Sequence, residues 1–179
     1  YQDSVAYGTA IRPITDPTRE GYTFIGWVPE LPATMPAYDV TVHAQWQINR
    51  YQLTINYFYF ENGTVQAAPS YTDTLEYGES YSVVSPTVQG FNPTIGTVSG
   101  VMGAEDITIS VSYLPRVYQV TLHPRGGMLL NGFTSDTTYT RGQVFWLPTA
   151  DDIVREGYSF GGWFTDTNFN GNPWIAIPN

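Results

Sequence analysis

Alternation of apolar and polar residues with a period of two is the main pattern along this chain. It occurs over residues 40–46 and 107–113, and again over residues 51–55 and 118–122. A period of two is typical of a β-strand that buries one face and exposes the other. The pattern therefore predicts strands over these four ranges, and a mainly β or α+β fold.

Helical patterns are sparse, because 17 glycines and 13 prolines interrupt any longer apolar periodicity. Thr149 is followed three residues later by Asp152, which is the spacing of a capping box. In a capping box, two side chains satisfy free backbone N–H groups at the start of a helix. The sequence therefore predicts a single helical turn there, running through Ile153 and Arg155.

The same segments recur along the chain. Residues 35–46 read MPAYDVTVHAQW and residues 102–113 read MGAEDITISVSY, a spacing of about 67 residues (102 − 35). The strand YQLTI at 51–55 returns as YQVTL at 118–122 with the same spacing. Because these landmarks keep one order and one spacing, the chain is predicted to consist of repeated units.

A second motif joins the outer parts of the chain. It reads REGYTFIGW at 19–27 and REGYSFGGW at 155–163, about two periods apart. A Tyr-Gly pair keeps the same phase loosely, at Tyr7–Gly8, at Tyr77–Gly78 and, as the glycine alone, at Gly142. We therefore expect one unit to occur three times, with insertions and deletions of a few residues.

The predicted units occupy residues 1–48, 49–115 and 116–179. The segments between them, near residues 47–50 and 114–117, are only a few residues long. Such short links leave neighbouring units in contact rather than freely mobile. The expected architecture is an elongated array of small modules.

The motifs resemble those of two families of bacterial surface repeats. The outer units resemble the Listeria-Bacteroides repeat, also known as the internalin B-repeat, in the Tyr7–Gly8 pair, in REGYTFIGW and REGYSFGGW, and in MPAYDVTVHAQW. The middle unit is similar instead to the mucin-binding-protein (MucBP) repeat, through NYFYFENGT, LEYGESY and GFNPTIGTVSG. The resemblance implies tandem ubiquitin-like β-grasp modules of secreted adhesins and stalks, at the cell surface and in the cell wall of Gram-positive bacteria.

Measured against the family's pattern, residue 1 falls after the opening strand and residue 179 falls before the closing strand. We therefore expect a partial repeat at 1–48, a whole repeat at 49–115 and a partial repeat at 116–179. In a β-grasp sheet the opening and closing strands are expected side by side, so each outer unit would leave an unpaired edge. The resulting expectation is either head-to-tail self-association through the outer units or a chain in which only the middle unit is fully ordered.

Charge and composition exclude several classes of function. The chain has seven Arg, no Lys and 16 acidic residues, for a formal net charge of −9, which makes nucleic acid and anionic membranes poor partners. It has no Cys, so disulfides, thiol catalysis and thiolate metal sites are absent. No apolar stretch approaches about 18 residues, so no membrane insertion is predicted within this sequence.

No residue pattern predicts catalysis, a cofactor or a metal. His43 and His123 fall on the polar faces of predicted strands. Asp151 and Asp152 fall where the first turn of a helix favours negative charge. The segment DTNFNG at 166–171 begins like a calcium loop, but it lacks the bidentate acid at position twelve, so a polar turn is expected. The sequence therefore predicts a protein that is not an enzyme.

Aromatic residues are the candidate binding residues. Most are expected to fill small cores, among them Phe24, Trp27, Phe160 and Trp163. The run Tyr57, Phe58, Tyr59 and Phe60 cannot all point inward from a strand, so these four residues are the candidate contact residues.

Two functions remain open. The first is a non-catalytic adhesive or spacer module of a cell-surface protein, which binds host or matrix protein weakly and many times over. The second is a mucin-type glycan-binding module that uses exposed aromatic side chains. A glycan array would distinguish the two.

Overall fold

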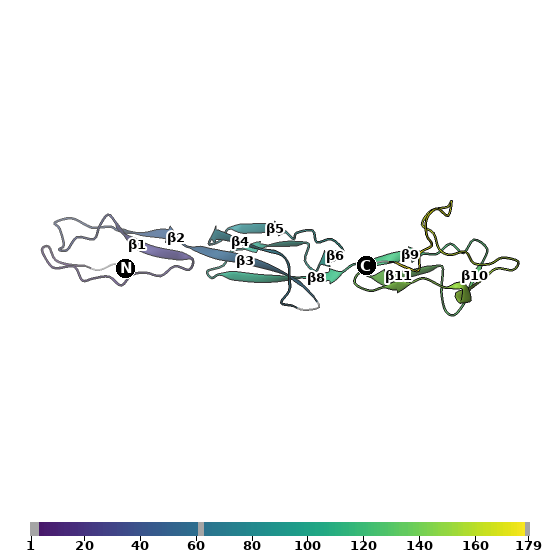
Figure 1. The fold of residues 1–179 in the computed structure, drawn as a ribbon. Coiled ribbons are helices and arrows are strands. Elements are labelled where there is room, and N and C mark those ends of the chain that lie inside the picture. Colours follow the sequence, from purple (N-terminus) through teal and green to yellow (C-terminus); the bar gives the residue numbers. More distant parts are fainter. Residues whose placement is uncertain (1–3, 61–62, 178–179) are drawn as a thin grey trace.

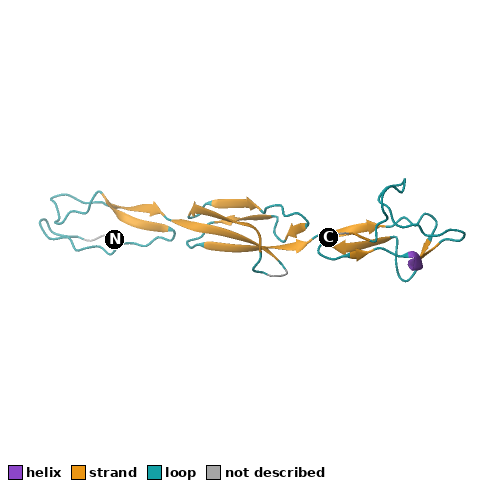
Figure 2. Cartoon of the chain, viewed as in Figure 1, coloured by secondary structure: helices purple, strands orange, loops and turns teal. Residues whose placement is uncertain are grey.

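The computed structural model describes residues 4–60 and 63–177, and their fold is all-β. The only helical element among these residues is the 3-10 turn η1 (Ala150–Asp152). The mainly β class is therefore confirmed, whereas the helices of an α+β fold are not found in the described parts of the chain. Figures 1 and 2 show the strands in three groups that follow one another in sequence order.

The first group contains two antiparallel strands, β1 (Tyr22–Val28) and β2 (His43–Ile48). Strand β2 begins three residues later than the period-two pattern predicts. Its partner β1 ends at Val28, directly opposite His43, so residues 40–42 have no neighbour for a ladder of backbone hydrogen bonds. The register shifts between Phe24 and Gly26, which marks a bulge in β1.

The second group is built on a mixed four-stranded sheet with the order β4-β3-β8-β6. Its central strands, β3 (Arg50–Tyr59) and β8 (Ile107–Pro115), are parallel, and Leu53 lies opposite Ile107. The outer strands are β4 (Gln66–Glu76) and β6 (Phe91–Pro93), and a separate pair is formed by β5 (Ser80–Val84) and β7 (Thr97–Val101).

Parallel neighbours need a crossover connection, which is usually a helix. Here the chain crosses from β3 to β8 through strands instead, and the β5–β7 pair contributes Tyr81, Val83 and Val98 to the core of this group. The two-stranded ribbon β5–β7 thus packs against the core in the place that a crossover helix usually occupies.

The core of the second group follows the predicted alternation. Leu53, Ile55 and Tyr57 of β3 are buried together with Val111 and Tyr113 of β8. The hydroxyl of Tyr113 donates a hydrogen bond of 2.6 Å to the carbonyl of Pro86, and burial raises the pKa of this phenol. A fully enclosed polar group needs such a partner.

The third group contains three short antiparallel pairs. They are β9 with β11, β10 with β13 and β12 with β14, and the strands are β9 (Val117–Thr121), β10 (Met128–Leu129), β11 (Asp136–Thr140), β12 (Phe145–Trp146), β13 (Ile153–Val154) and β14 (Ala176–Ile177). A second buried cluster joins Val120, Leu122 and Leu147. The described residues therefore contain two separate buried clusters, one in the second group and one in the third.

A helical turn begins where the sequence predicts it, but it ends at Asp152 instead of continuing through Ile153 and Arg155, because Ile153 and Val154 form β13. Thr149 precedes η1, and its backbone N–H and its hydroxyl both donate to the Asp152 carboxylate, at 2.9 Å and 2.7 Å. Asn131 donates a third hydrogen bond to that carboxylate. The hydrogen bonds from Asn131 and Thr149 lower the pKa of Asp152.

The links between the groups are shorter than predicted. Only Asn49 separates β2 from β3, and only Arg116 separates β8 from β9. The last strand of one group therefore leads almost directly into the first strand of the next.

Candidate functional site

The residues considered for catalysis lie apart from one another and in ordinary surroundings. The side chains of His43 and His123 are exposed, and Asp152 caps η1. Among the residues that the structure describes, no three His, Cys, Asp or Glu side chains are grouped closely enough to hold a metal ion. None of the helical structure within residues 4–60 and 63–177 is long and apolar enough to cross a membrane.

The DTNFNG segment forms a polar turn. The carboxylate of Asp166 accepts hydrogen bonds from the backbone N–H groups of Asn168, at 2.7 Å, and Asn170, at 3.4 Å. An aspartate that bonds to the backbone two residues later stabilises a turn. This accounts for the sequence pattern through local backbone geometry.

The aromatic run on β3 divides between two environments. Tyr57 is only 1% exposed and belongs to the core, so it is removed from the candidate contact residues. Tyr59 is half-buried and packs on Phe91, with ring centroids 4.6 Å apart. Phe58 is half-buried, and Phe60 is 63% exposed. Phe60 is therefore the member of the run that is best placed for an outside contact.

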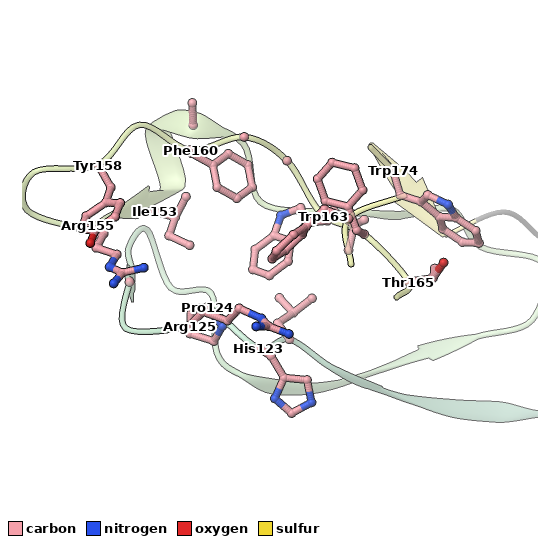
Figure 3. A pocket seen from close by; sticks show the side chains of 18 of the residues that line it. His123, Pro124, Arg125, Ile153, Arg155, Tyr158, Phe160, Trp163, Thr165 and Trp174 are labelled. Atoms are coloured by element: carbon pink, nitrogen blue, oxygen red, sulfur yellow. The ribbon is translucent and has the colours of Figure 1, made fainter. Parts of the chain in front are cut away.

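A cavity of about 900 Å³ lies in the third group of strands and was not predicted from the sequence. Its lining includes Val120, Leu122 and Leu147 of the small core and the aromatic side chains of Phe160 and Trp163 (Figure 3). Concave, largely apolar sites with a few polar groups are typical of ligand-binding pockets.

Trp163 is held firmly in the cavity lining. Its indole N–H donates a 2.7 Å hydrogen bond to the carbonyl of Pro148, and its ring meets Phe160 edge-on at 5.5 Å. Trp174 pairs with Trp163 through a backbone bridge and remains 41% exposed. The cavity thus contains one fixed and one accessible indole, and in Figure 3 Trp174 lies at the opposite end from Tyr158.

Two arginines bring positive charge to this cavity. The guanidinium carbon of Arg125 lies 5.2 Å from the ring centroid of Phe169, and that of Arg155 lies 3.8 Å from the ring centroid of Tyr158. Both arginines are exposed, and both also line the cavity. A chain of formal net charge −9 therefore has a local site with two cations beside aromatic rings.

The two copies of the REGY motif have the same local structure. The Arg–Tyr contact measures 3.7 Å for Arg19 and Tyr22, against 3.8 Å for Arg155 and Tyr158. In both copies the tyrosine N–H donates to the arginine carbonyl at 3.1 Å. The glycine between them has a positive φ in both cases, at Gly21 and at its counterpart in the third group.

The aromatic pair that follows the motif is also conserved in geometry. Phe24 and Trp27 meet edge-on at 5.2 Å and 65°, and Phe160 and Trp163 meet at 5.5 Å and 61°. The two tryptophans therefore share one local environment, as their matching motifs predict. They differ beyond it, because Trp27 lies in β1, whereas Trp163 has a bridge partner only.

All four aromatics of the two pairs are half-buried, and none belongs to the buried part of a core. In the first group they form an aromatic cluster with Trp46, which packs on Phe24 at 5.6 Å. These four side chains are therefore only partly enclosed, and Trp163 packs against the buried cluster of Val120, Leu122 and Leu147.

Comparison with known proteins shows which family the chain belongs to. The sequence model of the Listeria-Bacteroides repeat domain matches residues 1–45 and 118–177, which is more than half of the chain. The chain belongs to the Listeria-Bacteroides repeat family. The matched residues include both REGY motifs and leave residues 46–117 outside the match.

Two relatives extend well beyond the part that this chain of the Listeria-Bacteroides repeat family matches. The chain is 26% identical over 184 residues to a putative Gly-rich membrane protein of Evansella cellulosilytica, covering 89% of this chain and 19% of the relative. It is 34% identical over 104 residues to internalin H of Listeria monocytogenes, covering 52% of this chain and 18% of the relative. The chain thus spans about a fifth of the length of these relatives.

Among solved structures, the chain is similar to a type 2 repeat of the mucus binding protein MUB from Lactobacillus reuteri. The identity is 15% and the TM-score is 0.34, covering 54% of this chain and 76% of the other. This likeness is too weak to assign the fold of the middle unit.

Proposed function

We propose that this chain is a non-catalytic repeat region of an extracellular bacterial surface protein, in which three modules form an elongated array that acts as a spacer and as a weak, multivalent adhesin. The single observation that supports this most strongly is that one-residue links join successive strand groups. Links of that length keep neighbouring modules at a fixed spacing.

We further propose a β-grasp-like fold for the middle module at residues 49–115, with partial repeats at 1–48 and 116–179. The support is the side-by-side parallel pairing of its first and last long strands, β3 and β8. Strand β4, which forms a hairpin with β3, lies on one side of this pair, and the short strand β6 lies on the other.

The adhesive part of the proposal is tested by comparing single and multiple display. Beads that carry many copies of the chain are expected to adhere to surfaces coated with mucin or matrix protein, whereas the free chain binds too weakly to measure. This result follows because many weak contacts add through effective concentration. If the chain acts only as a spacer and makes no adhesive contacts, neither the beads nor the free chain will bind to the coated surfaces.

Glycan binding is a second candidate function, and the cavity in the third module favours it. Its indoles offer flat apolar faces, and Arg125 and Arg155 offer hydrogen-bond donors and positive charge. That combination suits a mucin-type glycan with a carboxylate or sulfate group. Phe60 of the middle module would be a separate contact, because it lies outside the lining of the cavity.

A glycan array with matched tryptophan variants tests this candidate. Trp174→Ala removes an indole that lines the cavity, and Trp146→Ala removes one that is 64% exposed and lies outside the lining. Binding to acidic glycans is expected to fall about tenfold or more in Trp174→Ala and to stay unchanged in Trp146→Ala. An equal response of the two variants, or no binding by the unaltered chain, would rule out the cavity as a glycan site.

A further inference from the structure

The two links between modules share one construction, which we call the joint. In the first joint, the carbonyl of Gly21 accepts from the N–H of Asn49 at 2.9 Å, and the carbonyl of Asn49 accepts from the N–H of Tyr77 at 3.0 Å. The first module, the link residue and the second module are thus joined by consecutive backbone hydrogen bonds.

The second joint repeats this arrangement with other residues. The carbonyl of Gly90 accepts from the N–H of Arg116 at 2.8 Å, and the carbonyl of Arg116 accepts from the N–H of Arg141 at 2.9 Å. In each joint, the residue that accepts the first hydrogen bond is a glycine, Gly21 or Gly90. The residue that donates the second hydrogen bond is Tyr77 or Arg141, and each of these directly precedes a glycine.

Side chains close each joint over its glycine. Gly21 and Gly90 are both buried, with φ of +73° and +78°. A Cβ at Gly21 would overlap the ring of Tyr77, and a Cβ at Gly90 would overlap the side chain of Arg141. Glycine is therefore required at both positions by its backbone conformation and by the close approach of the next module.

The residue after each glycine completes the contact. Tyr22 meets Tyr77 edge-on, with ring centroids 6.1 Å apart. Phe91 receives the guanidinium of Arg141 at 4.7 Å from its ring centroid. Each joint thus consists of a Gly-aromatic pair on one module and an X-Gly turn on the next, where X is Tyr or Arg.

The third module carries another Gly-aromatic pair at Gly157–Tyr158. Gly157 has the same φ, +75°, but no described atom outside its own neighbours lies within 4 Å of a Cβ placed on it. Tyr158 is 66% exposed and is held by Arg155 in the way that Arg19 holds Tyr22. The surface of a joint is present there without the contact seen in the other two.

The first module carries the complementary X-Gly turn at Tyr7–Gly8. The N–H of Gly8 donates to the carbonyl of Met35 at 2.9 Å, just as the N–H of Gly78 donates to the carbonyl of Met102 at 2.9 Å. The turn at residue 8 therefore has the geometry of the turn that forms the first joint. Tyr7 is 77% exposed.

We propose that Gly157–Tyr158 is a third docking site of this joint and binds the Tyr7–Gly8 turn of a second copy of the chain. The contact is head-to-tail, and a head-to-tail contact can repeat along a row of copies. In the other two joints, Asn49 and Arg116 link the two modules covalently. The proposed contact between two copies has no such link residue, so a dissociation constant on the order of 1 mM is expected.

The test is a series of ¹H–¹⁵N NMR spectra of the whole chain between about 0.05 and about 2 mM, a range that spans the expected dissociation constant. Concentration-dependent shifts are expected at Gly157 and Tyr158 and, at the other end, at Tyr7 and Gly8. Tyr7→Ser should reduce the shifts at least fivefold. Tyr38→Ser, which alters a tyrosine of similar exposure (72%), should not.

A second pair of variants probes the docking site itself. Gly157→Ala places a Cβ in the proposed contact, and Gly171→Ala introduces a Cβ at a comparable φ of +84°, in open space. Only Gly157→Ala is expected to abolish the shifts. Absence of any shift at Gly157 and Tyr158, or equal loss with Tyr7→Ser and Tyr38→Ser, would overturn the proposal.

Discussion

Separate hydrophobic clusters in the middle and third modules predict that the two modules lose stability independently. Leu53 is fully buried in the middle cluster, where it lies with Ile55 and Val111. Replacing such a leucine by alanine costs about 2–5 kcal/mol, and full enclosure places Leu53→Ala at about 3 kcal/mol or more. A change of about 3 kcal/mol is more than a hundredfold in the folding equilibrium of that module.

The magnitude is large compared with the stability of so small a unit. A module of about 65 residues has only a few kcal/mol of stability, so Leu53→Ala should leave a measurable fraction of the middle module unfolded. Leu122, which is 5% exposed in the other cluster, provides the matching change in the third module.

Hydrogen exchange with mass spectrometry reads out the two modules in one experiment. In Leu53→Ala, protection should fall over β3 and β8 and persist over β9, and in Leu122→Ala the order should reverse. If either variant lowers protection equally in both modules, the two clusters form one cooperative unit and the reasoning from separate cores is wrong.

Three further predictions concern charge, metal and proteolysis. The hydrogen bonds from Asn131 and Thr149 lower the pKa of Asp152 in the folded state. They therefore stabilise the fold at pH values above the ordinary carboxyl pKa, and this stabilisation is lost as the pH falls through the pKa of the folded state. Asn131→Ala should raise that pKa in an NMR titration, and an unchanged value would contradict the cause. The midpoint of thermal unfolding should not change on adding EDTA, because the carboxylate of Asp166 accepts a hydrogen bond from the backbone N–H of Asn168 in a polar turn; a drop of several degrees would refute this. Native chain should resist trypsin, since only seven Arg and no Lys are present; rapid digestion to small peptides would contradict it.

Local features of the fold were predictable because they depend on nearby residues. Alternation along 51–55 and 107–113 gave the strands that bury Leu53 and Val111. The capping box at Thr149 depends on two residues three positions apart, and the structure contains it. The REGY motif recurs together with the aromatic residues that follow it, and the edge-on contacts of Trp27 and Trp163 with their phenylalanines match.

Features that depend on distant residues could not be derived from local patterns. The parallel pairing of β3 with β8 joins segments about 50 residues apart, and side-by-side opening and closing strands were expected only because of the family resemblance. The cavity brings Arg125 and Phe169 together from separate loops, and both residues have a positive φ, at 49° and 56°. Trp163 was interpreted as core because a lone sequence cannot distinguish a half-buried aromatic from an enclosed one.

The joints lie between these two cases. A glycine followed by an aromatic residue occurs in each module at Gly21, Gly90 and Gly157, so the signal was present in the sequence. The reason for a glycine at these positions lies in the contact with the next module. Only the packing of Tyr77 on Gly21 and of Arg141 on Gly90 shows why no side chain fits there.

Small-angle X-ray scattering on the dilute chain tests the central proposal, the elongated array, most directly. A compact chain of this length has a radius of gyration of about 16 Å. Three modules in line, each about as long as a ten-residue strand of roughly 33 Å, form a rod of about 100 Å with a radius of gyration near 30 Å. A value near 30 Å is the expected result, and a value near 16 Å would contradict the array.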